Sequence, residues 1–136
     1  MSIYQCKSVK SSGTNYKEVY RGAFGLYREI KRKTKRRPYI RSAYFRKEKI
    51  FLGLYWQHLE DHFSQNDKTR RLKFFGCGLE LIQKSKYEPT SKENPNKPSE
   101  ILHRFMGITK NKETFKVQIK EDKRSGEKFL ISIFPG

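Results

Sequence analysis

The chain has 136 residues, a length that fits one domain. It carries 31 Lys and Arg against 14 Asp and Glu, a net charge of +17, and its 10 Phe and 8 Tyr offer enough aromatic surface for a core. The aromatic content argues against a disordered chain, and the charge favours a polyanionic partner, above all nucleic acid. A solubility surface or a basic tail is the plain alternative, and a membrane surface is a weaker one.

The sequence shows no signal for export, membrane insertion or a cysteine framework. The start, MSIYQCKSVK, lacks the apolar run of a signal peptide, and the longest apolar run, IFLGLYW, is too short to span a bilayer. Cys6 and Cys77 are too few for a disulfide framework or a metal site, and Cys77 is expected as a small core residue. We therefore expect a cytoplasmic protein that uses no membrane, metal or cofactor.

The N-terminal half predicts a tail followed by helices. Residues 1–17 are polar and rich in Ser and Lys, so we expect a flexible tail there. A helical part is expected over residues 18–84, because apolar residues recur at helical spacing. The expected helices cover residues 23–33, 48–63 and 68–86. Gly76 and Gly78 are costly inside the last helix unless another element packs closely against it.

The C-terminal part predicts an antiparallel sheet. Residues 85–99 are polar and rich in Pro, so they are expected to form a loop before a sheet over residues 100–136. The expected strands cover residues 100–108, 114–122 and 127–135. We therefore expect an α+β fold in which N-terminal helices pack on a C-terminal antiparallel β-sheet of three to five strands, all within a single basic domain over residues 18–136.

The turn RSG sets the expected register of the last hairpin. It suits a three-residue loop with Gly126 in the left-handed conformation. That loop places Gln118 opposite Ser132 and Lys120 opposite Leu130. One face of the hairpin then carries polar residues.

These polar residues are of the types needed to cut RNA without a metal. RNA supplies its own nucleophile, the 2′-hydroxyl, so an enzyme needs a base, an acid and cations beside the phosphate. The candidates are His103, Arg104, Gln118, Lys120 and Ser132. His103 would move a proton, Arg104 and Lys120 would hold the phosphate, and Gln118 and Ser132 would orient the substrate. His103 and Arg104 are consecutive, so either a bulge re-aims one of them, or only one belongs to the site and His103 is a core residue.

Residues 101–135, ILHRFMGITKNKETFKVQIKEDKRSGEKFLISIFP, carry a resemblance to a known family. They resemble the C-terminal sheet of the barnase–colicin–RelE-like ribonuclease superfamily, and are most similar to members linked to phages and toxin–antitoxin pairs. There a His/Arg strand is followed by an F-x-V-x-I strand and a G-x-x-F/Y-L-x-S strand. The resemblance implies helices on a four- or five-stranded antiparallel sheet and a metal-independent endoribonuclease whose site includes the same five residues. A toxin of this kind implies an acidic antitoxin or inhibitor protein as a partner.

The segment REIKRKTKRRPYIRSAYFRKEK is the most basic part of the chain. Residues 21–49 hold 12 Lys and Arg against two Glu. Cations there would neutralise RNA phosphates, while Tyr39, Tyr44 and Phe45 would either stack on unpaired bases or fill the core. The residues expected to bind nucleic acid are Arg32, Lys33, Lys35, Arg36, Arg37, Tyr39, Arg41, Arg46, Arg70, Arg71 and Lys116.

Three other interpretations stay open. The same residues would serve a non-catalytic nucleic-acid-binding module. The motif QIK at 118–120 resembles the strand of metal-dependent restriction-type nucleases, although such a site needs an Asp on the preceding strand, and ILHRFMGIT has no carboxylate. His58 and His62 are spaced like a zinc-ligand pair on one helix, a pattern that a partly buried helix face explains better.

Overall fold

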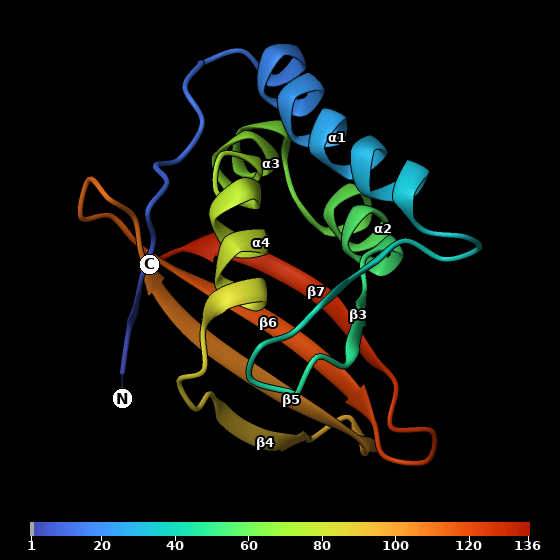
Figure 1. Ribbon diagram of the computed structural model, residues 1–136. Coiled ribbons are helices and arrows are strands. Elements are labelled where there is room, and N and C mark those ends of the chain that lie inside the picture. Colours follow the sequence, from blue (N-terminus) through green and yellow to red (C-terminus); the bar gives the residue numbers. More distant parts are fainter. Residues whose placement is uncertain (1) are drawn as a thin grey trace.

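A computed structural model describes residues 2–136 of the chain. The elements follow in the order β1 (Tyr4–Gln5), α1 (Tyr16–Lys33), β2 (Tyr39–Arg41), β3 (Lys49–Phe51), α2 (Gly53–His62), α3 (Gln65–Leu72), α4 (Phe75–Lys84), β4 (Thr90–Asn94), β5 (Lys97–Ile108), β6 (Thr114–Asp122) and β7 (Lys128–Pro135). The helices gather over one side of a sheet whose long strands are β5, β6 and β7 (Figure 1). The α+β class is confirmed, but the N-terminal half contains three short strands besides its helices.

The sheet is larger than the three to five strands expected, and it is mixed and not antiparallel throughout, because β1 pairs with β5 and β3 with β7 in parallel. Its order is β1-β5-β6-β7-β3-β2, and β4 pairs with β5 beside this path. The strands that sequence analysis did not find, β1 to β4, are only two to five residues long. Such short segments give no alternating pattern, and pairing with the long strands defines them instead.

Two segments that were expected to lack regular structure contain strands. Within the expected tail, Tyr4–Gln5 pairs in parallel with β5, while residue 1 lies outside the described residues. Glu80 on α4 holds this segment by accepting hydrogen bonds from Tyr4 Oη, at 2.8 Å, and from the backbone and hydroxyl of Ser8. Within the expected loop 85–99, β4 pairs antiparallel with β5. Four of the five β4 residues are exposed, so its composition is that of a loop.

Capping residues and packing set where the helices begin and end. Helix α1 starts inside the expected tail because the side chain of Asn15 accepts a hydrogen bond from Lys17 N at 2.8 Å. The expected helix over 48–63 is α2 alone, since Lys49–Phe51 pairs with β7 as β3. The expected helix over 68–86 is two helices, α3 and α4.

The core lies between the helices and one face of the sheet. Phe115, Val117 and Ile119 of β6 are fully buried there, as the alternation in this strand predicts. Helix α4 packs directly on this face at β7, because a Cβ atom on Gly78 would lie 2.3 Å from Cδ1 of Ile133, which lies opposite Val117. Cys77 is buried, as expected.

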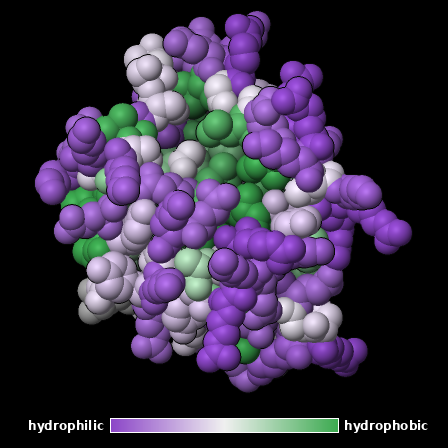
Figure 2. Space-filling view, viewed as in Figure 1, coloured by the Kyte–Doolittle hydropathy of each residue, from purple (hydrophilic) through white to green (hydrophobic). Residues whose placement is uncertain are grey.

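A second layer of aromatic rings joins α1 to the rest of the helices. Tyr20, Phe24 and Tyr27 surround Trp56 of α2, with ring centres 5.2 to 5.7 Å from the Trp56 ring. Figure 2 shows this helical side of the molecule, where hydrophilic groups dominate and apolar groups gather where the helices meet. Across residues 2–136, each helix is too short or too polar to traverse a bilayer.

The β6–β7 hairpin confirms part of the expected register. Gly126 has a φ of 75°, and Gln118 lies opposite Ser132. Lys120 lies opposite Phe129, however, and not opposite Leu130, because the register shifts by one residue after Gln118. The irregularity leaves Ile131 without a direct partner on β6.

Candidate functional site

The side of β5–β7 that faces away from the core carries the polar residues of interest. Alternation along these strands places Arg104, Gln118, Lys120 and Ser132 on this side, which we call the polar face. Helices α2 and α3 run along β7 and form one border of the polar face. Side chains from three strands and two helices therefore meet at a single surface.

Two hydrogen bonds lie in one line across the polar face. Arg104 Nη2 donates to Gln118 Oε1 at 3.0 Å, and Gln118 lies directly opposite Ser132. Arg71 of α3 donates from Nη1 to Ser132 Oγ at 2.9 Å. Three of the five predicted catalytic residues therefore lie together, and Arg71, which was expected only to bind nucleic acid, completes the line.

The two guanidinium groups share an aromatic neighbour and have no carboxylate partner. Arg71 and Arg104 lie 5.2 and 5.5 Å from the ring centre of Phe134, and Arg71 lies 3.7 Å from that of Phe63. Within residues 2–136, neither forms an ion pair with Asp or Glu. Because Arg binds phosphate through two parallel hydrogen bonds, this pair has the chemistry to bind a phosphate group.

Lys120 extends the polar face toward an acidic group that sequence analysis missed. Lys120 Nζ lies 3.3 Å from Glu100 Oε2. Burial raises the pKa of Glu100, but hydrogen bonds from Asn94 and Lys120 outweigh that effect and hold this pKa below its ordinary value. Glu100 is therefore ionised and already paired with Lys120. Alternation along β5 from Arg104 back to Glu100 was the signal that could have found it.

Two imidazoles of α2 lie at the border of the polar face. His58 and His62, whose ring centres are 4.7 Å apart, line a cavity of about 240 Å³ together with Lys120 and Ile131. Burial lowers the pKa of His58, and the neighbouring His62 and the charge of Arg71 lower it further. His58 is therefore neutral at pH 7 and able to accept a proton. The spacing of His58 and His62 was visible in the sequence, but their position beside Lys120 and Ile131 was not.

His103 lies on the opposite side of the sheet from the other predicted catalytic residues. Strand β5 pairs with β6 without a register shift from Glu100 to Ile108, so no bulge re-aims it. His103 is 7% exposed, with Nδ1 2.6 Å from Ser91 Oγ and Nε2 2.8 Å from Glu121 Oε1. It joins β4, β5 and β6 on the core side, as alternation along β5 indicates.

The residues expected to bind nucleic acid fall into separate groups. Arg71 and Lys116 belong to the polar face, and Arg70 is paired with Asp67 beside it. Arg32 is exposed on α1, where it pairs with Glu29. A cavity of about 440 Å³ is lined by Lys33, Lys35, Arg36, Arg37 and Tyr39, together with Thr34, Lys49 and Phe51.

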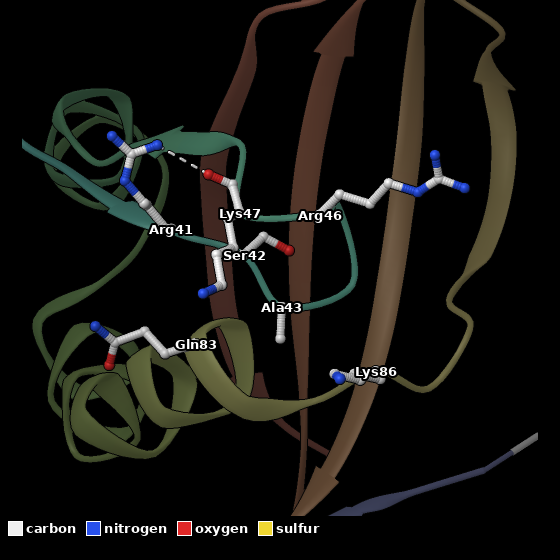
Figure 3. Close-up of a pocket in the computed structure, with 7 residues that line it drawn as sticks. All are labelled: Arg41, Ser42, Ala43, Arg46, Lys47, Gln83 and Lys86. Carbon is white, nitrogen blue, oxygen red and sulfur yellow. Dashed lines mark hydrogen bonds between the residues drawn. The ribbon is translucent and has the colours of Figure 1, made fainter.

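Arg41 and Arg46 line another basic cavity, of about 750 Å³, between the β2–β3 turn and the end of α4. Figure 3 shows Lys47 pointing between Arg41 and Gln83, whereas Arg46 extends over β5. The two aromatic residues of the β2–β3 turn point into the protein. Tyr44 and Phe45 contact the Phe105 ring at 5.8 and 6.0 Å, so they serve the core and are not free to stack on bases.

Comparison with known proteins finds no match for this chain among family models, curated proteins or solved structures. Over residues 2–136, no three His, Cys, Asp or Glu side chains gather in a way that would hold a metal ion. The polar face consists of cations, two imidazoles, an amide, a hydroxyl and, beside Lys120, the carboxylate of Glu100, and these groups define the chemistry that it can support.

Proposed function

We propose that the chain binds RNA and cuts it at the polar face without a metal ion, with the 2′-hydroxyl of the RNA as nucleophile. The observation that best supports this is the meeting of a neutral imidazole, His58, with three cations, Lys120, Arg71 and Arg104, around one surface. Transfer of a phosphoryl group to the 2′-oxygen needs a base and positive charge beside the phosphate.

Each group has a role in the proposed reaction. His58 takes the proton of the 2′-hydroxyl while the 2′-oxygen forms a bond to phosphorus. The bond from phosphorus to the 5′-oxygen breaks, and His62 returns a proton to that oxygen. The products are a 2′,3′-cyclic phosphate and a 5′-hydroxyl, so atoms and charge balance. Arg71 and Arg104 stabilise the charge that develops on the phosphoryl oxygens.

This proposal keeps four residues of the sequence-based site and replaces the fifth. Arg104, Gln118, Lys120 and Ser132 stay, with the amide and hydroxyl orienting the two Arg side chains. His103 is left out because it lies on the core side. The resemblance to toxin-type ribonucleases and an acidic inhibitor protein as partner remain parts of the proposal, since a net charge of +17 suits both RNA and an acidic protein.

The test is cleavage of RNA by the purified chain in the presence of EDTA. We expect cleavage to survive chelation and to fall about 10²–10⁴-fold in His58→Asn, the usual contribution of a general base. Arg104→Gln should lower the rate by about 10²–10³-fold. His103→Gln, checked for folding by circular dichroism, is the control and should keep its activity. Equal loss in His103→Gln and His58→Asn, or activity that requires Mg²⁺, would overturn the proposal.

A non-catalytic RNA-binding module is the second candidate. The hydrogen bonds from Arg104 to Gln118 and from Arg71 to Ser132 favour it, because these groups already satisfy one another. In that case RNA would bind intact, with an affinity that falls steeply as salt rises. Binding without any cut product at low salt would therefore select this alternative.

A further inference from the structure

We propose that the polar face continues into a track for an unpaired RNA strand, which leads from Lys120 across β7, β3 and β2 to the basic loop at residues 33–37. This inference rests on the proposed function only in taking RNA as the ligand. It assigns to the site a substrate class, single-stranded RNA, and a set of residues that the cleavage chemistry does not use.

The register of the sheet places the residues of the track next to one another. Lys120 lies opposite Phe129 of β7, Phe129 lies beside Phe51 of β3, and Phe51 lies opposite Tyr39 of β2. Direct partners point to the same side of a sheet, so Phe129, Phe51 and Tyr39 form an aromatic row that continues the polar face. Their ring centres are 5.8 and 6.2 Å apart along the row. All three side chains are partly exposed.

Cations accompany each ring of the aromatic row. The Arg37 guanidinium lies 3.9 Å from the ring centre of Phe51, and Lys49 Nζ lies 4.7 Å from that of Tyr39. Lys120 Nζ lies 5.4 Å from the ring centre of Phe129. Single-stranded nucleic acid is bound in this way, with bases stacked on aromatic rings or guanidinium planes and phosphates held by neighbouring cations.

A cavity at the end of the row is large enough to hold a nucleoside. It measures about 440 Å³, within the range of small-ligand pockets, and Tyr39 and Phe51 form its aromatic wall. Its other lining residues include five cations and no carboxylate: Lys33, Lys35, Arg36, Arg37 and Lys49. Arg37 also pairs with Glu127 at 2.6 Å, on the rim, and its side chain stays 56% exposed.

A duplex does not fit this arrangement. Paired bases hide their faces in the stack, so rings and guanidinium planes have nothing to stack on except at a strand end. A row of three rings flanked by cations therefore selects strands whose bases are free. The backbone of such a strand would pass Lys120 and reach Arg71 and Arg104, where the proposed cut takes place.

The test uses a 2′-O-methyl oligonucleotide, which lacks the nucleophile and cannot be cut. Its affinity as a labelled single strand and as a hairpin duplex is measured by fluorescence anisotropy at fixed salt. We expect the single strand to bind more tightly, and Phe51→Leu to weaken it about tenfold while duplex binding is unchanged. Tyr87→Leu, at an aromatic residue that is 49% exposed outside the row, is the matched control.

Arg37→Gln gives a second test that leaves the Phe51 side chain itself unchanged. It should also weaken the single strand and reduce the change in fluorescence of a strand that carries 2-aminopurine, a base whose emission reports stacking. Equal affinities for single strand and duplex, or equal effects of Phe51→Leu and Tyr87→Leu, would overturn the track. Loss of cleavage activity would not, because the probe is never cut, so the track and the ribonuclease proposal fail separately.

Discussion

Gly78 tests whether α4 lies as close to the sheet as the fold requires. An Ala Cβ there would lie 2.3 and 2.9 Å from Cδ1 and Cγ1 of Ile133, so the whole Ile133 side chain must move. Crowding of this kind costs about 1–3 kcal/mol. Ala is better than Gly inside a helix by about 1 kcal/mol, which offsets part of that cost. We therefore expect Gly78→Ala to lower the free energy of unfolding by up to about 2 kcal/mol.

Gly76 offers the matched control in the same helix. A Cβ there would meet only Leu26 Cδ1, at 3.5 Å, which is ordinary van der Waals contact. Gly76→Ala should therefore raise the free energy of unfolding by up to about 1 kcal/mol. The two variants are compared by urea unfolding followed by circular dichroism, and we expect them to differ by about 1–3 kcal/mol. Equal stability of the two variants would show that Ile133 does not lie against Gly78.

Three further outcomes follow from the site and its supports. The pKa of His58 lies below 6.5, so the rate of RNA cleavage should fall as pH drops below that value, and His58→Asn should lose this acid limb. Glu100→Gln removes the carboxylate partner of Lys120. If Glu100 only competes with phosphate, RNA should bind more tightly at low salt. Loss of cleavage with unchanged binding would instead make Glu100 the base. Hydrogen bonds outweigh burial and hold the pKa of the Glu80 carboxyl below 4.5, so the free energy of unfolding should fall as pH drops below 4.5. Glu80→Gln should speed amide hydrogen exchange in residues 4–8.

The sequence predicted the parts of the fold that carry their own pattern. Strand β6 alternates Phe115, Val117 and Ile119 with polar residues, and only one side of a sheet accommodates that order. Strand β3 has no such pattern, because its three residues fit the start of a helix equally well. It pairs with β2 and with β7, and β7 lies almost 80 residues further along the chain.

The candidate site was predictable only where its residues share a hairpin. The turn at Gly126 related Gln118 to Ser132, but it could not reveal the shift that moves Lys120 opposite Phe129. Arg71 joins Ser132 from 61 residues away in the sequence, and His58 comes from a third element. Contacts of this kind follow from helix packing, which no local pattern in the sequence encodes.

The ends of the sheet bear on how the chain behaves at high concentration. Long exposed strands recruit further chains by backbone pairing, which is a route to aggregation. Here the outermost strands, β1 and β4 on one edge and β2 on the other, are two to five residues long, while β6 and β7 lie inside the sheet. The exposed Arg41 ends β2, and a charge at that position opposes the addition of another strand. The short edge strands, which no alternating pattern revealed, thus oppose the pairing of strands between molecules.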